Sequence, residues 1–223
     1  MKVLSLICQK GGTAKTTTAI NLAVEALAYG LEVVVIDLDP QVSACDWKDI
    51  RGDQPPLVAT TPVPHLPRTL KAMQENGADL VIIDTAGHTN DAAGAAARVA
   101  DLILMPLQPS LVDLKTVAST LQLIRISGGN QPHALLSRVK AAGSRHDETT
   151  KWLQSQGITV CPVMLGERVI YQDAYAQGQA VTEAEPFGKA SQEIREVYMY
   201  ASSLLGLPTA RSDADSVAIR KVA

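Results

Sequence analysis

A run of small, hydroxylated and basic residues at positions 9–18 constrains the fold of this chain more than any other stretch. The run reads Gln-Lys-Gly-Gly-Thr-Ala-Lys-Thr-Thr-Thr. It follows an apolar segment at 3–8 and leads into a helical pattern that stops at Gly30. Adjacent glycines allow several backbone N–H groups to point into one concavity, and a helix that starts there adds the positive end of its dipole. A strand, a glycine-rich turn and a helix in this order predict a phosphate-binding loop.

Two side chains of this loop have the chemistry that a nucleoside triphosphate and its metal ion require. Lys15 is expected to reach the β- and γ-phosphates, and the hydroxyl of Thr16 is expected to bind magnesium. The other residues expected to contact the nucleotide belong to the same loop and the first helical turn: Lys10, Gly11, Gly12, Thr13, Ala14 and Thr17. The alternative is a Gly-Gly turn with incidental lysines, for which both the strand–helix context and the spacing would have to be coincidental.

The loop departs from the common G-x-x-x-x-G-K-[ST] form in two places. Gln9 stands at the first glycine position, and Ala14 stands where a glycine precedes the lysine. With Lys10 ahead of the glycine pair, the sequence matches the variant Lys-Gly-Gly-x-x-Lys-[Thr/Ser]. In these residues the chain resembles the ParA/MinD family of deviant-Walker ATPases, in which Lys10 would be the signature lysine. It looks most like the small ParA partition proteins that lack an N-terminal helix-turn-helix domain.

A second motif follows the apolar run 31–36, which is rich in valine, as a parallel strand buried on both faces would be. The run leads into the pentapeptide 37–41, Asp-Leu-Asp-Pro-Gln. Taken alone, an Asp-Pro pair favours a turn that caps the following helix. Asp-x-Asp-Pro-Gln is also the second signature of the ParA/MinD family. The resemblance implies that Asp39 orients the attacking water and that Asp37 assists the metal site.

A third carboxylate, Asp84, closes the apolar segment 80–83, Leu-Val-Ile-Ile. Four apolar residues capped by Asp form the Walker B pattern, in which the carboxylate holds magnesium, usually through water. Many core strands end in Asp, so the pattern gains its weight from the phosphate-binding loop that precedes it. The following Thr-Ala-Gly at 85–87 would then lie near the γ-phosphate and could sense its loss.

The resemblance also implies contacts near the base of the nucleotide. Pro106 begins a proline-bearing loop, Pro-Leu-Gln-Pro-Ser, after the apolar strand pattern at 102–105. Arg138 stands at the end of another expected strand, where relatives contact adenine, and a guanidinium group can stack on a purine ring. A surface salt bridge is the alternative for Arg138.

The chain of 223 residues suits one α/β domain, which we expect over residues 1–207, followed by a disordered tail at 208–223. Alternating strand and helix patterns predict a doubly wound, mostly parallel sheet of about seven strands with helices on both faces. Ligands of such sheets bind at the carboxyl edge of the strands, which is where the nucleotide should lie.

Composition narrows the setting in which the protein works. The net charge of −3 gives no sign of nucleic-acid binding, so any such surface must be a local patch. The three cysteines, Cys8, Cys45 and Cys161, show no C-x-x-C spacing, which favours free thiols in a reducing cytosol. No apolar run approaches the roughly 18–20 residues that span a bilayer. A strand pattern from the first residues leaves no room for a signal peptide or a preceding DNA-reading domain.

The resemblance implies a magnesium-dependent ATPase, weak without a partner, with Lys10, Lys15 and Asp39 as catalytic residues. Lys10 would reach across a homodimer interface to the partner's phosphates, so that ATP bridges two copies. The implied role is an ATP-driven dimerisation switch in the cytoplasm that binds DNA of the nucleoid non-specifically and drives plasmid or chromosome partition. A centromere-binding, ParB-like protein or a cargo adaptor would stimulate hydrolysis.

By the same resemblance, the segment 166–189 would contribute to the dimer and to a DNA-facing patch. Its basic candidates, with the helix that follows, are Arg168, Lys189 and Arg195. Scattered cations are more often a solvated face than a binding site. No stable membrane association is expected, because the last residues are too short and too weakly apolar for a membrane-binding helix.

Other functions stay open at this point. The switch could position a cargo other than DNA, or act at a membrane as MinD does, which the tail disfavours. A metabolic ligase of the dethiobiotin synthetase kind would need a small-molecule pocket and a carboxylate substrate. An iron–sulfur reductase resembling nitrogenase iron protein would need a cluster-binding cysteine pair, which Cys8, Cys45 and Cys161 do not supply.

Overall fold

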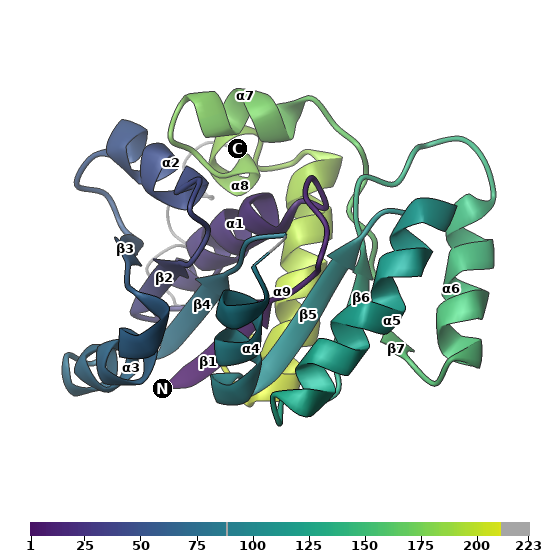
Figure 1. The fold of residues 1–223 in the computed structure, drawn as a ribbon. Coiled ribbons are helices and arrows are strands. Elements are labelled where there is room, and N and C mark those ends of the chain that lie inside the picture. The colour runs from purple at the N-terminus through teal and green to yellow at the C-terminus, as the bar shows by residue number, and fades with distance from the viewer. Residues whose placement is uncertain (88, 211–223) are drawn as a thin grey trace.

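The computed structural model describes residues 1–87 and 89–210, without the side chains of residues 111–115. Within these residues, seven strands form one sheet in the order β3-β2-β4-β1-β5-β6-β7, and every adjacent pair is parallel (Figure 1). The expected doubly wound α/β fold is confirmed. Most of the tail that we expect to be disordered, from residue 211 onward, lies outside the described residues.

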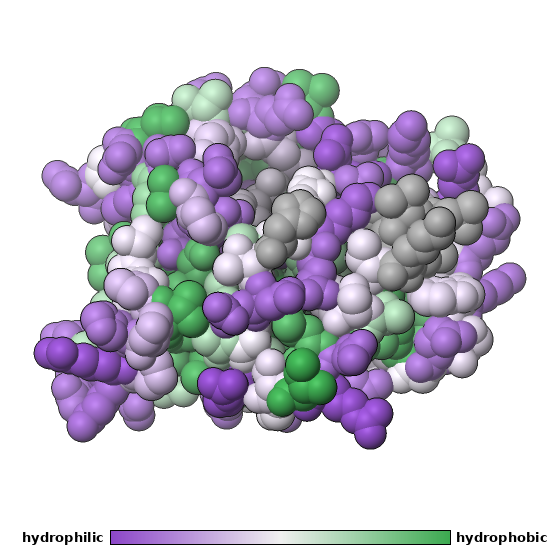
Figure 2. Space-filling model, in the orientation of Figure 1, coloured by the Kyte–Doolittle hydropathy of each residue, from purple (hydrophilic) through white to green (hydrophobic). Residues whose placement is uncertain are grey.

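Strands and helices alternate along the chain. The strands are β1 (Lys2–Leu6), β2 (Val33–Asp37), β3 (Leu57–Thr60), β4 (Leu80–Asp84), β5 (Leu102–Leu107), β6 (His133–Leu136) and β7 (Thr159–Val160). The helices are α1 (Lys15–Leu27), α2 (Ser43–Arg51), α3 (Leu66–Glu75), α4 (Asn90–Val99), α5 (Leu111–Ile126), α6 (Arg145–Ser155), α7 (Ile170–Ala176), α8 (Val181–Ala184) and α9 (Lys189–Leu205). A 3₁₀ turn, η1 (Val63–His65), precedes α3. Hydrophilic side chains cover much of the outer surface, including the side formed by α6 (Figure 2).

The sheet is buried on both faces because side chains alternate along each strand. In β2, Val33 and Val35 belong to the core shared with α1, α2 and α7–α9. Val34 and Ile36 belong to the opposite core, shared with α3, α4 and α5. Successive side chains of a strand point to opposite faces of the sheet, so a parallel strand between two layers of helices needs an apolar residue at every position.

The strand order places the segments of the site at one edge of the sheet. β1 lies between β4 and β5, and Leu6 at its end is in register with Asp84 at the end of β4. Asp37 at the end of β2 is also in register with Asp84. The loops that follow these three strands therefore leave the sheet side by side, at its carboxyl edge.

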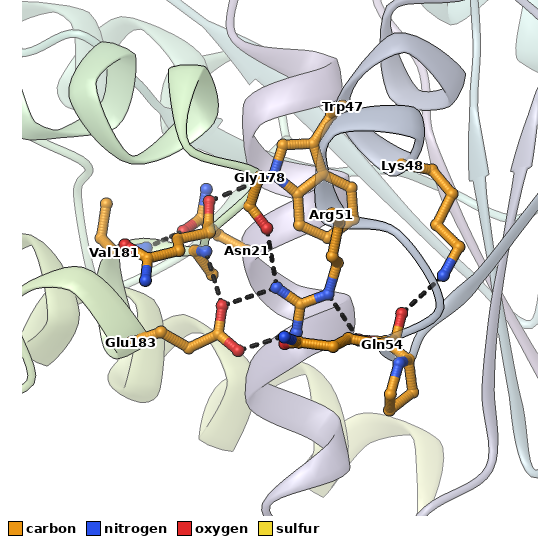
Figure 3. A network of polar contacts seen from close by, with 11 residues as sticks. Asn21, Trp47, Lys48, Arg51, Gln54, Gly178, Val181 and Glu183 are labelled. Carbon is orange, nitrogen blue, oxygen red and sulfur yellow. Dashed lines mark hydrogen bonds and ion pairs between the residues drawn. The ribbon is translucent and has the colours of Figure 1, made fainter.

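A buried arginine fixes α2 against the α7–α8 region, on the same side of the sheet as α1 (Figure 3). The Arg51 side chain, only 4% exposed, forms an ion pair with Glu183 at 2.7 Å. Its guanidinium also donates to the carbonyl oxygens of Gly178 at 2.9 Å and Pro55 at 2.6 Å. Burial of a guanidinium is costly unless its donors are satisfied, and here the carboxylate and two carbonyls satisfy them.

Two further contacts complete this network. The Trp47 indole lies under the Arg51 guanidinium, 4.9 Å from it, and donates to the Gln179 carbonyl oxygen at 3.1 Å. Asn21 of α1 accepts from the Val181 amide at 2.8 Å and donates to the Thr17 carbonyl oxygen at 2.8 Å. The helix that follows the glycine-rich loop and the helix that follows the Asp-x-Asp-Pro-Gln motif are thus both bonded to residues 178–183.

Gly178 is the position where this network tolerates least change. Its φ is +65°, and a Cβ there would lie 2.6 Å from the backbone nitrogen of Arg51. Gly206 has a similar φ of +68° with nothing within 4 Å of the Cβ position. Gly206→Ala should cost only the left-handed strain of about 1–2 kcal/mol. Gly178→Ala should cost roughly 1–3 kcal/mol more, because the α2 backbone must move.

Thermal unfolding of the two variants measures this difference. At about 2–4 °C per kcal/mol for a domain of this size, Gly178→Ala should melt several degrees below Gly206→Ala. Equal melting temperatures would show that the close approach of Gly178 to α2 does not contribute to stability.

Candidate nucleotide-binding site

A cavity of about 520 Å³ opens at the carboxyl edge of the sheet, where three motifs separated in sequence come together. It is lined by residues 11–17 of the glycine-rich loop, by residues 39–41 and Ser43 after β2, and by Ala86, Gly87 and Thr89 after β4. A crevice outside the carboxyl ends of parallel strands is the usual ligand position in this class of fold.

The glycine-rich loop has the conformation that a phosphate-binding loop needs, even where it lacks a glycine. Gly12 has φ +74°, and Ala14 also adopts a left-handed conformation, with φ +65° and ψ 29°. Ala14 therefore carries strain of about 1 kcal/mol where the common form of the motif has glycine. The Lys15 side chain, in a residue only 6% exposed, donates to the Lys10 carbonyl oxygen at 2.9 Å, which holds the ammonium against the loop backbone.

The loop after β4 rests directly on the glycine-rich loop. A Cβ at Gly87 would lie 2.6 Å from both the amide nitrogen of Gly11 and the carbonyl carbon of Lys10, so only glycine allows this approach. The Thr85 hydroxyl donates to the Leu6 carbonyl oxygen at 2.7 Å and ties the same loop to the end of β1. The Thr-Ala-Gly segment thus lies against the loop, in the position from which it could respond to a γ-phosphate.

A hydroxyl and a buried carboxylate form a pair suited to magnesium. The Thr16 hydroxyl donates to Asp84 Oδ2 at 2.5 Å, while the buried Asp84 Oδ1 has no hydrogen-bond partner among the described residues. Burial raises the pKa of Asp84 to about 7, against the lowering effect of the Thr16 hydrogen bond, and the nearby Asp37 charge raises it further. A carboxylate oxygen left unpaired beside a hydroxyl fits a hard, oxygen-binding cation.

The ligand set also indicates which kind of metal would fit. The described residues contain no group of three or more His, Cys, Asp or Glu that could hold a metal ion by themselves. Magnesium is usually held by one or two carboxylates, together with waters and substrate phosphates. Asp84 and Thr16 are therefore sufficient on the protein side, and the fit is to magnesium bound together with a nucleotide.

Asp37 and Asp39 have different environments. Both Asp37 oxygens accept backbone N–H groups, from Asp39 and from Ala44, each at 2.9 Å. Burial raises the pKa of Asp37, and these amides oppose the increase. Asp37 thus organises the turn and the start of α2, as an Asp-Pro turn predicts. Asp39 accepts the Gln41 amide at 3.0 Å and lines the cavity. A metal role for Asp37 stays a prediction.

A second cavity, of about 480 Å³, adjoins the first through Gly12, Ala14 and Thr17. Its far wall includes Arg138, which has a positive φ of +50° and an ion pair with Glu167 at 3.0 Å. Arg138 therefore makes the surface salt bridge and lines a cavity as well. We interpret this second cavity as the place for the base of a nucleotide, because it continues from the loop that would hold the phosphates.

Sequence reasoning missed part of this second cavity. Glu167, Arg168 and Tyr171 line it, although the resemblance assigns their segment, 166–189, to the dimer and a DNA-facing patch and not to the nucleotide. They reach the cavity because Val139 and Gly166 form an isolated parallel bridge, which carries the segment after β7 beside the end of β6. That bridge is a long-range contact with no local sequence signal.

The expected place of Pro106 is wrong. Pro106 is buried inside β5, in register with Leu135 of β6, and it lines neither cavity. The pairing of β5 with β1 ends at Leu104, so the missing N–H of a proline two residues later costs no ladder hydrogen bond on that side. The loop begins at Gln108 instead, and Gln108 donates to the Gly12 carbonyl oxygen at 2.8 Å.

The three basic candidates for DNA contact do not form one patch. Arg168 forms an ion pair with Glu193 of α9, and Arg195 lies 3.9 Å from the buried Glu25 of α1. Glu193 and Arg195 are two residues apart on α9, so their side chains point about 200° apart around the helix axis. Arg168, which is bound to Glu193, therefore lies on a different side of α9 from Arg195. Lys189 is exposed on the Glu193 side of α9.

Among the described residues, no helix is long and apolar enough to cross a membrane.

Comparison with known proteins supports the resemblance to the ParA/MinD family that the sequence motifs indicate. Residues 1–60 match the family described as "AAA domain", and residues 61–127 match the family described as "ATPase MipZ". Maintenance of carboxysome distribution protein A of Gloeobacter kilaueensis is 30% identical over 200 residues, which are 88% of this chain and 90% of that protein. Protein ParA of Rhizobium radiobacter is 28% identical over 187 residues, 80% of this chain and 84% of its own length.

Solved structures share the fold. The ATP complex of a Cyanothece McdA variant superimposes with a TM-score of 0.73 at 18% identity, covering 95% of this chain and 99% of that one. A chain of the Aquifex aeolicus MinC:MinD complex gives 0.75 at 17% identity, covering 91% and 96%. With its P-loop NTPase fold, its lysine-bearing glycine loop and its similarity to these relatives over most of its length, the chain belongs to the ParA/MinD family of deviant-Walker ATPases.

Proposed function

We propose that this chain is a ParA-type switch: ATP bridges two copies, the dimer binds DNA non-specifically, and a partner protein triggers the hydrolysis that separates them. The observation that carries the proposal is the different position of the two loop lysines. Lys15 is buried and lines the nucleotide cavity, whereas Lys10 is partly exposed and does not line it. A lysine on the loop but outside its own cavity is suited to reach the phosphates of a second copy.

The charges of the site support the proposed reaction. Hydrolysis builds negative charge on the γ-phosphoryl oxygens, and Lys15 would neutralise part of it within the same copy. Magnesium, held by Thr16 and Asp84, would neutralise another part when bound with the nucleotide. Lys10 of the partner would add the remaining cation. Asp39 would orient the attacking water, while Asp37 holds the Asp39 backbone and α2 in place.

The biological role that we propose is partition of a plasmid or chromosome, with the protein in the cytoplasm and bound to the nucleoid. A ParB-like protein would then stimulate hydrolysis. A relative named Protein ParA, similar over 84% of its length, supports this role.

Positioning of a protein assembly is a second candidate role. It is favoured by the 30% identical relative whose name refers to carboxysome distribution. In that case a cargo adaptor would take the place of the ParB-like protein, while the ATP-bridged dimer and its DNA contact would be the same.

Substitution of the two lysines tests the division of labour between them. Lys15→Ala should abolish nucleotide binding, because the cation inside the cavity is removed. Lys10→Ala should bind ATP with an affinity within a fewfold of wild type, but should not dimerise with ATP or respond to the partner protein. Equilibrium binding of a fluorescent ATP analogue and analytical ultracentrifugation measure the two properties separately. An ATP-dependent dimer of Lys10→Ala would refute the trans role.

Asp39→Ala should separate binding from turnover. Without the carboxylate that orients water, the variant should bind ATP, dimerise and accumulate in the ATP state, with hydrolysis reduced by roughly 10²–10⁴-fold, the usual contribution of a positioned acid–base group. A single-turnover hydrolysis assay measures the rate. Turnover at the wild-type rate would remove Asp39 from the reaction.

Asp84→Asn should stabilise the metal-free protein while weakening its magnesium site. A carboxyl whose pKa rises from 3.8 to about 7 on folding costs stability progressively as pH increases between those values. The variant should therefore gain about 2 kcal/mol more over wild type at pH 8 than at pH 5.5, at 1.36 kcal/mol per pKa unit. The further stabilisation by magnesium with ADP should disappear.

Urea unfolding at both pH values, with and without magnesium and ADP, measures this prediction. Comparing variant and wild type at the same pH cancels the titration of other groups. If the free energy of unfolding of the variant differs from that of wild type by the same amount at both pH values, ionisation of the buried Asp84 carboxyl does not cost the stability that its raised pKa implies.

A further inference from the structure

A third cavity, of about 430 Å³, lies beside the end of β6, between the loop after β5 and the start of α6. We call it the basic cavity, after the four basic side chains that line it: Arg138, Lys140, Arg145 and His146. None of its described lining residues is Asp or Glu. In a chain of net charge −3, this is the local concentration of positive charge that composition alone could not reveal.

Two of the three Lys and Arg side chains that line the basic cavity are not neutralised by neighbours. Arg138 forms an ion pair with Glu167 at 3.0 Å, and His146 lies 3.7 Å from Asp147. Lys140 and Arg145 are exposed and form no ion pair with any described residue. The basic cavity thus has two cations available for an external anion.

The amino ends of two helices lie beside the basic cavity. α6 begins at Arg145, which lines the basic cavity, and α5 begins directly after Ser110, which lines its other side. Ser144 at the start of α6 makes no side-chain capping bond. The unpaired amides of a helical first turn and the dipole favour an anion at such a position. Asp147 and Glu148 in the first turn of α6 already place negative charge at that helix end, so the basic cavity depends on its two unpaired cations to attract an external anion.

The exposure of these groups indicates what kind of anion fits. A site for a small anion would hold it with buried donors, whereas Lys140 and Arg145 are long, solvated and separated by a turn at Gly143, where φ is +104°. Solvated cations spaced around an open concavity suit phosphates spaced along a polymer, which bind by neutralisation of charge and release of counterions. Figure 2 shows that the surrounding α6 side is largely hydrophilic.

We propose that the basic cavity binds the phosphodiester backbone of duplex DNA, through Lys140 and Arg145, without regard to base sequence. This inference rests on the proposed function and relocates its DNA contact to residues 138–146. Of the candidates from sequence, Arg168 and Arg195 are occupied by glutamates, so they have less charge to offer. Arg138 lines both the basic cavity and the cavity proposed for the base, so the two cavities adjoin at this residue.

The test compares Lys140→Gln/Arg145→Gln with the control Arg125→Gln/Lys151→Gln. The control removes one Arg and one Lys charge from exposed side chains of α5 and α6 that form no ion pair with a described residue and do not line the basic cavity. Full-length protein with ATP and magnesium is titrated into a fluorescent duplex of mixed sequence at roughly 50 and 200 mM salt, the range over which phosphate contacts change affinity strongly. Nucleotide affinity and the ATP-dependent dimer are measured in parallel.

The double variant should bind DNA at least tenfold more weakly at the lower salt concentration. Its dependence of log K on log salt should be shallower by about 1 for each phosphate that the protein no longer neutralises. Its nucleotide affinity and dimer should equal those of wild type, and the control should bind DNA as wild type does.

Three results would overturn the inference. Wild-type DNA affinity and salt dependence in the double variant would refute it while leaving the proposed DNA binding intact. Weaker nucleotide binding with unchanged DNA binding would assign the basic cavity to phosphates of the nucleotide. Failure of wild type itself to bind DNA with ATP would refute both this inference and the DNA part of the proposed function, but not the ATP-bridged dimer.

Discussion

The hydrogen bond from Thr16 to Asp84 is the interaction around which the site is built. It joins the first turn of α1 to the end of the central strand β4, and it keeps a carboxylate in a position where burial raises its pKa to about 7. Gly87 packs against the glycine-rich loop, so the loop after β4 lies beside this Thr16–Asp84 pair. A buried carboxylate with one unpaired oxygen is unfavourable for the protein alone, and a cation bound there would offset that cost.

The Arg51 network connects the nucleotide cavity to the α7–α8 region. Asp37 holds the start of α2 at the cavity, and Arg51 holds its end against Gly178 and Glu183. Asn21 bonds the same region to α1, one turn after Thr17. The loop after β2 and residues 178–183 are therefore joined, through α2, by buried and hydrogen-bonded contacts.

Much of the fold and the centre of the site could be predicted from sequence, because their signals are local. The glycine loop, the valine-rich strand and the apolar run ending in Asp84 are each recognisable within about ten residues of sequence. The errors and omissions involve contacts between distant segments. Pro106 lies inside β5 because the pairing of β5 with β1 stops before it. Glu167 reaches the second cavity, which we propose for the base, because Val139 and Gly166 form a single bridge. The basic cavity combines two helix ends that no sequence period relates.

The proposed switch depends on ATP joining two copies of this chain, and the molar mass of the wild-type protein in solution is the most direct test of that step. Light scattering after size-exclusion chromatography would be measured with magnesium and either ADP or a non-hydrolysable ATP analogue. We predict a mass near that of the 23.7 kDa chain with ADP and about twice that mass with the analogue. A single copy in both nucleotide states, at concentrations where the analogue saturates the site, would contradict the ATP-bridged dimer.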